Sequence, residues 1–426
     1  MTLVALVFVI SLAAGLPIAF ALGLTGTVQA LLMDNPNLLV MLPQRMFAAA
    51  DNFSLMAIPL FVLAGELMGF GGITEALANM SRSVIGHIRG GLAYVTVVVG
   101  VFLGALLGSA NAAAALLGKV MYPEMRKDDY DEVFSNCLVA ATSILGPIIP
   151  PSMVFIVYGV AANLSIGELF FAGIAPGLLL AAGYMAIIVW LGKRSQWTIR
   201  PRAQMKEVTS SFLKAAPSLL VPIIILGGIL GGVTTPTESA AAASVVAVIL
   251  GTVVYRKLKW SHVPKILEST GVVSASIMII VAMANILGWT MALEQIPQDI
   301  ANALLSLTSN KYMALLLINL LLLFVGMVME TIAAIIILVP VFLPVIDTLG
   351  IDPLHFGMVV SFNLIVGLLT PPVGVALFTT SIVTETPLQK LVKPIWLWVG
   401  VAMAVLLIIT YVPDIVTFLP RWAFDK

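Results

Sequence analysis

Two long apolar stretches of this 426-residue chain, 91–118 and 312–345, carry polar side chains at their midpoints. These polar residues are Ser109, Asn111, Glu330 and Thr331. Hydroxyl, amide and carboxylate oxygens bind hard cations such as sodium, and they form hydrogen bonds with an organic substrate. Half-helix N-termini at such midpoints also favour an anionic group. The pattern therefore predicts substrate contacts at these four residues.

Glu330 is the most unusual of them. It lies between Met329 and Thr331 in an otherwise apolar segment, where an ionised carboxylate costs several kcal/mol unless it is paired. No Lys or Arg falls at comparable depth in the sequence. The partner of Glu330 is then a bound cation, a proton or a donor group on a substrate. The structural alternative is a protonated, hydrogen-bonded glutamate.

Downstream of each polar midpoint the chain contains a Pro-Pro pair. The first segment reads Gly146-Pro-Ile-Ile-Pro-Pro151 and the second reads Gly367-Leu-Leu-Thr-Pro-Pro372. Proline removes a backbone donor, and unpaired carbonyls persist in a bilayer only inside protein, beside water or beside a bound ion. We expect two cation sites at these breaks, and Ser152 as a further substrate contact. The predicted sodium ligands are Gly104, Ser109, Gly146, Ile149 and Pro150 in one half, and Gly326, Gly367, Thr370 and Val373 in the other. The alternative is that each break is only a kink padded by a neighbouring helix.

The composition identifies the elements that must position these residues. The chain is 60% hydrophobic and 10% charged, with a mean hydropathy of +1.10, whereas soluble domains carry about 25% charged residues. Apolar runs long enough to span a bilayer recur along it. We predict spans near 3–33, 53–70, 131–161, 169–192, 212–233, 236–255, 270–292, 357–383 and 395–419.

The distribution of basic residues predicts the topology. Arg82, His87 and Arg89 precede the stretch 91–118, and Lys119, Arg126 and Lys127 follow it, so the positive-inside rule places both of its ends in the cytoplasm. A segment with both ends on one side is a re-entrant hairpin. The loop 193–206, which includes Arg194 and Arg200, and the loop 256–265 are also cytoplasmic by this rule. Counting crossings places the N-terminus inside, and places the C-terminus and the base of the second hairpin outside. The inner membrane of a bacterium is the expected location.

The two halves of the chain repeat each other at an offset of about 220 residues. The Gly104–Gly146 spacing agrees with the Gly326–Gly367 spacing to within one residue, and Pro17 corresponds to Pro236. We predict a first repeat over 1–205, with hairpin 91–118 and a broken helix at 146–152. The second repeat covers 206–426, with hairpin 312–345 and a broken helix at 367–374. With the hairpins on opposite faces, the expected fold is an all-α polytopic membrane protein with inverted repeats.

Several other classes are disfavoured. The net charge of zero argues against nucleic-acid binding, and Cys137 is the single cysteine. The three histidines lack metal-ligand spacing, so we expect sodium and no transition metal or other cofactor. No nucleophile–base motif and no P-loop is present, which disfavours an enzyme and ATP coupling. A channel remains the other alternative, although paired breaks on opposite faces suit alternating access.

Taken together, the motifs resemble the large membrane subunit of tripartite ATP-independent periplasmic (TRAP) transporters. They are Gly-Leu-Pro-Ile-Ala-Phe-Ala-Leu-Gly (15–23), Ala-Ile-Pro-Leu-Phe-Val-Leu-Ala-Gly-Glu (57–66), Gly-Ser-Ala-Asn-Ala-Ala (108–113), Pro-Pro-Ser (150–152), Thr-Pro-Thr-Glu-Ser (235–239) and Leu-Thr-Pro-Pro-Val-Gly (369–374).

The resemblance covers nearly the whole chain and implies a sodium-driven importer with an elevator mechanism. It also implies two partners, a small four-helix membrane subunit and a periplasmic substrate-binding protein. The chain is most similar to large subunits of sialic acid systems, in which Ser109, Ser152 and Glu330 would contact the sugar. A C4-dicarboxylate or another carboxylate is the alternative substrate, and a proton carried by Glu330 is the alternative coupling ion.

Overall fold

The computed structural model describes residues 2–33, 35–193, 195, 197, 199, 201–308 and 310–424. Across these residues every regular element is a helix, which confirms the all-α expectation. Arg194 and Arg200 of the predicted basic loop lie outside the described residues.

Ten α-helices make up the described part of the first half of the chain. They are α1 (Thr2–Ala13), α2 (Ile18–Leu32), α3 (Pro36–Ala50), α4 (Ala57–Phe70), α5 (Ile73–Ile85), α6 (Gly91–Leu107), α7 (Ala110–Lys127), α8 (Glu132–Ser143), α9 (Met153–Ala162) and α10 (Ile166–Gly192). The short helix η1 (Phe53–Met56) leads into α4.

The second half contains twelve α-helices in its described part. They are α11 (Met205–Ala215), α12 (Leu220–Leu230), α13 (Pro236–Ile249), α14 (Val263–Leu293), α15 (Ile296–Leu307), α16 (Lys311–Val328), α17 (Thr331–Thr348), α18 (Pro353–Gly367), α19 (Val375–Val383), α20 (Leu388–Val392), α21 (Trp396–Tyr411) and α22 (Asp414–Phe424). Three short helices, η2 (Ala216–Leu219), η3 (Leu250–Val254) and η4 (Trp260–His262), extend α12, α13 and α14.

Seven helical stretches of the described chain are long and apolar enough to cross a membrane, and α21 with α22 makes an eighth if the bent pair is one span. The seven are Phe53–Phe70, Ile166–Gly192, Met205–Leu230, Pro236–Val254, Trp260–Leu293, Lys311–Val328 and Thr331–Thr348. They confirm a multi-pass membrane protein.

Two predicted spans differ from the structure. The stretch 3–33 is not one span, because Gly15 adopts a positive φ of 80° and Pro17 starts a new helix, so that α1 and α2 pack against each other. The crossing count that placed the N-terminus inside therefore no longer holds. The stretch 395–419 is also wrong as a straight span, because α22 is bent by 60° from α21 after Val412 and Pro413.

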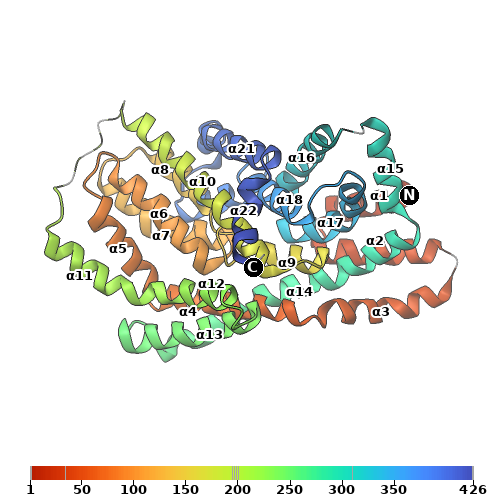
Figure 1. Ribbon diagram of the computed structural model, residues 1–426, viewed down its shortest axis with the longest axis horizontal. Helices are drawn as coiled ribbons and strands as arrows, with labels where there is room; N and C mark the ends of the chain where they lie inside the picture. Colours follow the sequence, from red (N-terminus) through yellow and green to blue (C-terminus); the bar gives the residue numbers. More distant parts are fainter. Residues whose placement is uncertain are drawn as a thin grey trace.

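Most helix packings in one half have a counterpart at the same offset in the other half. The pair α4 with α13 corresponds to α14 with α2, and α6 with α8 corresponds to α16 with α18. The return arm α7 packs on α19, and the return arm α17 packs on α9. In Figure 1, α3, α4, α12, α13 and α14 follow one long edge of the molecule, and the hairpins and broken helices lie above them. We call α2, α3, α4, α13 and α14 the frame, because they pack on one another and contact the hairpins through α4 with α6 and α14 with α17. The repeat boundary at residue 205 stays a prediction.

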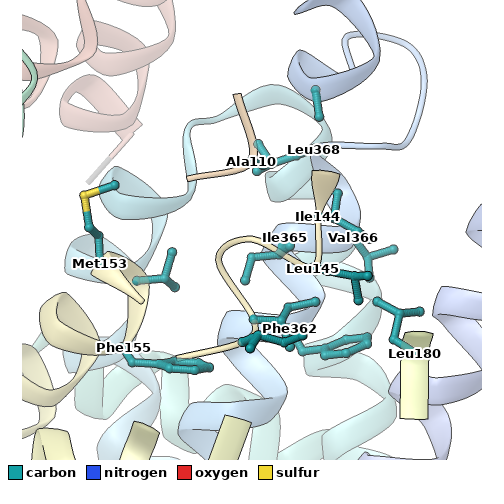
Figure 2. Close-up of a cluster of buried hydrophobic side chains, with 14 of the residues drawn as sticks. Ala110, Ile144, Leu145, Met153, Phe155, Leu180, Phe362, Ile365, Val366 and Leu368 are labelled. Carbon is teal, nitrogen blue, oxygen red and sulfur yellow. The ribbon is translucent and has the colours of Figure 1, made fainter. Parts of the chain in front are cut away.

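The breaks between α8 and α9 and between α18 and α19 lie within one apolar core. Figure 2 shows Ile144 and Leu145 of the first break close to Ile365 and Val366 at the end of α18. Their side chains are fully buried. The two regions that the sequence separates by about 220 residues are therefore held together by hydrophobic burial, the main favourable term for such a contact.

Candidate functional site

The tips of the two hairpins line one small cavity. Its volume is about 60 Å³. It is lined from the first half by Gly108, Ser109, Ala110, Asn111, Pro147, Met153 and Val154, and from the second half by Glu330, Thr331, Ile332, Leu368 and Val375. Four of the five predicted substrate contacts, Ser109, Asn111, Glu330 and Thr331, are thus brought to one place. We call this cavity the tip site.

The first hairpin presents an open helix N-terminus to the tip site. Gly108 adopts a positive φ of 57° and turns the chain, and Ser109 precedes α7 as its N-cap residue. The Ser109 side chain makes no capping hydrogen bond, and Asn111 in the first turn is exposed. Within the described part of the chain, the first backbone N–H groups of α7 therefore have no side-chain partner, which leaves the positive end of the helix dipole facing the cavity.

Glu330 occupies the corresponding position in the second hairpin, as the N-cap of α17. Its Oε2 accepts a hydrogen bond of 3.1 Å from the backbone N–H of Ala333. The carboxyl group is therefore hydrogen-bonded to the backbone, as the structural alternative expected. Because the residue is exposed, its remaining lone pairs are open to a ligand.

Thr331 carries an unsatisfied hydroxyl. Its side chain is 2% exposed, and no residue in the described part of the chain forms a hydrogen bond with Oγ1. Leaving a buried hydroxyl unpaired costs about 1–3 kcal/mol, so the position favours a polar guest in the adjoining cavity.

Ser152 is placed differently from the expectation. The residue is 1% exposed and is absent from the cavity lining, and its Oγ donates a 2.5 Å hydrogen bond to the carbonyl of Pro147. The hydroxyl stabilises the proline break from behind, whereas Pro147 itself faces the tip site. Ser152 therefore does not line the tip site, and its substrate contact stays a prediction.

Close backbone approach explains the paired glycines. A Cβ added to Gly367 would lie 2.4 Å from the carbonyl carbon of Gly326. A Cβ added to Gly104 would lie 2.9 Å from the carbonyl oxygen of Leu145 and 3.3 Å from the Cα of Gly146. Each outgoing hairpin arm thus crosses its own broken helix at a glycine pair, where no side chain fits. These are the glycines that the spacing of the sequence singled out.

The breaks expose oxygen atoms without donors. In the first break, no described residue donates a hydrogen bond to the carbonyl oxygens of Gly146, Ile149 or Pro150. In the second break, the carbonyls of Thr370 and Val373 likewise receive none from the described chain, and the Thr370 hydroxyl donates to Val366 at 2.9 Å. Such an all-oxygen donor set fits a hard monovalent cation. No group of three or more His, Cys, Asp or Glu residues suited to a metal ion occurs in the described part.

Polar side chains brace both broken helices from outside the tip site. Asn363 on α18 donates to the side-chain and backbone oxygens of Asn319 at 2.8 and 2.9 Å, and Asn319 donates to Thr410 at 3.0 Å. On α8, Asn136 accepts a hydrogen bond from Thr384 and donates to Thr386 at 3.1 Å. Asn319 and Asn363 therefore bridge neighbouring helices.

The sequence reasoning missed several apolar residues that line the tip site. Examples are Met153, Ile332, Leu368 and Val375. Only their proximity to the tips and breaks distinguishes them from other apolar residues of the chain. Apolar residues in an apolar chain carry no local signal of this role.

The comparisons with known proteins agree with this architecture. Residues 5–415 match the family described as the DctM component of the tripartite ATP-independent periplasmic transporter. The chain therefore belongs to this family of transporter permeases.

Individual relatives extend over nearly the whole chain. An isethionate TRAP transporter permease of Oleidesulfovibrio alaskensis is 41% identical over 96% of this chain, which spans 65% of that protein's length. The sialic acid TRAP transporter large permease SiaM of Vibrio cholerae is 39% identical over 96% of this chain and 95% of its own. The YdaH transporter of Alcanivorax borkumensis, with 17% identity, shares the fold with a TM-score of 0.62 over 91% of this chain and 88% of its own.

Proposed function

We propose that this protein imports a small organic anion across the bacterial inner membrane in symport with sodium. The observation that carries the proposal is the tip site, where both hairpin tips and both proline breaks line a single cavity. A carrier needs one ligand site that both halves can enclose.

The two halves of the tip site differ in polarity, and this difference favours one orientation of the substrate. The acidic group of the anion would lie near Ser109 and Asn111, at the uncapped N-terminus of α7. Glu330 and Thr331 would then meet hydrogen-bond donors at the other end of the substrate. An anion with hydroxyl groups suits this arrangement, so N-acetylneuraminate is the first substrate to test. The isethionate and sialic acid specificities named for the relatives are both of small organic anions.

Sodium would bind at the two proline breaks. The residues that would hold it are Gly104, Ser109, Gly146, Ile149 and Pro150 in the first half, and Gly326, Gly367, Thr370 and Val373 in the second. The carbonyl oxygens of Gly146, Ile149, Pro150, Thr370 and Val373 support this assignment, because they receive no hydrogen bond from the described chain. Those of Gly104, Ser109 and Gly367 accept backbone hydrogen bonds from Gly108, Ala113 and Thr370. A bound cation would supply positive charge beside the helix ends that hold the anion, and so link the affinities for the two.

The mechanism we propose is of the elevator type. The tip site, at about 60 Å³, is smaller than the roughly 300–1,000 Å³ of typical ligand pockets, so the hairpins must separate to admit the substrate. The frame with α2, α4, α13 and α14 would stay fixed while the hairpins and broken helices move. The proposed partners are a small four-helix membrane subunit and a periplasmic binding protein that delivers the substrate.

Uptake by proteoliposomes tests the proposal. They would contain this chain and its cognate membrane subunit, and radiolabelled N-acetylneuraminate would be added with the binding protein. We expect uptake that requires an inward sodium gradient and the binding protein. Uptake that persists when potassium replaces sodium would refute the cation sites and favour a proton carried by Glu330. Absence of uptake for N-acetylneuraminate, followed by sodium-dependent uptake of succinate or isethionate, would correct the substrate alone. Absence of uptake for all three anions would refute the proposed function.

A further inference from the structure

A second cavity, of about 460 Å³, follows directly on the tip site. It lies between α3 and α14 of the frame and α9 and α17 of the moving part. The tip site uses Met153 of α9 and Ile332 of α17, and this second cavity uses Val157 and Ile336 of the same helices. A separation of four residues is about one helical turn, or about 6 Å. The two cavities are therefore successive along the same two helices. We call the second one the vestibule.

The vestibule lies near the end of α14 that is remote from the basic loop 256–265. Helix α14 begins near Lys259 and Lys265 of the predicted cytoplasmic loop, and its 31 residues extend about 46 Å. The vestibule is lined by the other end of this helix, including Asn285 and Trp289. It is therefore placed to receive solutes from the non-cytoplasmic side.

The polar groups of the vestibule suit an anion. The guanidinium of Arg45 on α3 lies over the ring of Trp289, with its Cζ 5.0 Å from the ring centroid. Arg45 is exposed, and no carboxylate of the described chain forms a salt bridge with it. Two amides, Asn52 and Asn285, also line the cavity, and no acidic residue of the described chain does. The lining thus carries one positive charge and donors without a compensating negative charge.

Asn285 differs from the bridging residues Asn319 and Asn363. Its side chain forms no hydrogen bond with any described residue. It is exposed although it lies on a membrane-crossing helix. A side-chain amide without a protein hydrogen-bond partner is tolerated at such a depth when it faces a water-filled cavity or a polar ligand.

We propose that the vestibule is an anion-binding station, in which Arg45, held on Trp289, and Asn285 bind the carboxylate or sulfonate of the incoming substrate before it reaches the tip site. The stacking orients a planar fork of donors toward the cavity, which suits bidentate recognition of such groups. This inference rests on the proposed function for the identity of the ligand. Its electrostatic part is independent of that function.

Cysteine labelling tests the charge of the vestibule without a substrate. Cys137 is buried and would be replaced by alanine, and Asn285→Cys would serve as the reporter. Spheroplasts would be treated with an anionic reagent, sulfonatoethyl methanethiosulfonate, or with its cationic trimethylammonioethyl analogue. We expect Arg45→Gln to lower the ratio of anionic to cationic labelling rates by about tenfold, and Arg45→Lys to preserve the ratio.

Lys311→Gln is the matched control. Lys311 also lies over an aromatic ring, that of Tyr312 at 5.1 Å, but it starts α16 outside the vestibule. Its loss should leave the labelling ratio unchanged. Ala48→Cys, which lies on α3 in the same lining, is a second reporter if Asn285→Cys does not accumulate. An unchanged ratio of labelling rates in Arg45→Gln would overturn the proposal, because Arg45 would then not set the charge of the cavity. No labelling of either reporter in folded protein would also overturn it, because the cavity would then be filled by lipid or closed.

Uptake kinetics in the complete proteoliposome system test the role in transport. With the anion found to be transported, we expect Arg45→Gln to raise KM about tenfold and to leave the maximal rate nearly unchanged, since the residue binds substrate before the tip site. Equal kinetics for Arg45→Gln and Lys311→Gln would overturn the station, whereas the sodium dependence of the unmodified protein would still support the proposed function. If the vestibule proves charge-selective but the protein transports no organic anion, the proposed function and the proposed carboxylate or sulfonate ligand would both be refuted.

Discussion

The crossing of Gly326 and Gly367 allows one prediction to be worked in detail. In Gly367→Ala the new Cβ would lie 2.4 Å from the carbonyl carbon, 2.6 Å from the Cα and 2.7 Å from the carbonyl oxygen of Gly326. Ordinary contacts of a Cβ begin near 3.4 Å. The two backbones must then separate by about 1 Å, and no flexible side chain is available to yield.

The cost follows from this geometry. Overpacking of this kind typically destabilises by about 1–3 kcal/mol, and a backbone–backbone clash falls at the upper end of that range. By the usual scaling, unfolding a chain of this length carries an entropy of about 0.9 kcal/mol/K, so a loss of about 3 kcal/mol lowers Tm by about 3 °C. Uptake should fall more steeply than stability, because the displaced arm α16 carries the tip that holds Glu330.

Substitutions of two further glycines serve as comparisons within the same protein. Gly104→Ala meets its nearest atom at 2.9 Å and should lower Tm by a smaller amount. Gly400→Ala, on α21, meets nothing within 4 Å and should leave Tm unchanged or raised, since alanine favours a helix by about 1 kcal/mol. Thermal unfolding of the purified variants in one detergent measures all three. Equal Tm values for Gly367→Ala and Gly400→Ala would refute the reasoning that a tight glycine crossing holds the hairpin.

Three other variants separate stability from transport. Asn363→Leu removes both hydrogen bonds to Asn319 and leaves buried polar groups of Asn319 unsatisfied, which costs about 1–3 kcal/mol of stability. Tm should therefore fall by about 2 °C, and an unchanged Tm would contradict the bracing role. Thr235→Ala breaks the reciprocal cap with Glu238 at the start of α13 and should cost about 1 kcal/mol while uptake per folded molecule stays the same; reduced uptake would contradict a purely structural cap. Glu330→Gln keeps an oxygen for the Ala333 N–H, so Tm should stay within about 1 °C while uptake falls about tenfold or more; full uptake would remove the carboxylate from the binding site.

Most of the site could be found from the sequence, because its residues break strong local rules. Glu330 places a carboxylate in an apolar run, and the two Pro-Pro pairs interrupt spans. Such violations are costly in a bilayer, so each of them indicates a site. Their repetition at a constant offset predicted that the two hairpins are equivalent, and the structure brings both tips to one cavity.

Other features depended on how the chain turns at a break or on contacts between distant segments. The hydroxyl of Ser152 follows the first Pro-Pro pair, as a ligand would, yet it donates to the carbonyl of Pro147, five residues earlier, because the chain turns back at the break. Asn285 resembles Asn319 in its sequence surroundings. One faces a cavity and the other a neighbouring helix, and only the packing of α14 against α3 and α17 distinguishes them.

The sequence by itself determined the membrane-spanning helical class, the two breaks and the polar tips, because hydrophobic length, proline and buried charge act locally along the chain. Only contacts between separate segments determined that α1 and α2 pack against each other within 3–33, and that Arg45 and Trp289 meet across α3 and α14. The physical reason is that these outcomes depend on which surfaces face each other, and a uniformly apolar chain offers many equivalent surfaces until packing selects among them.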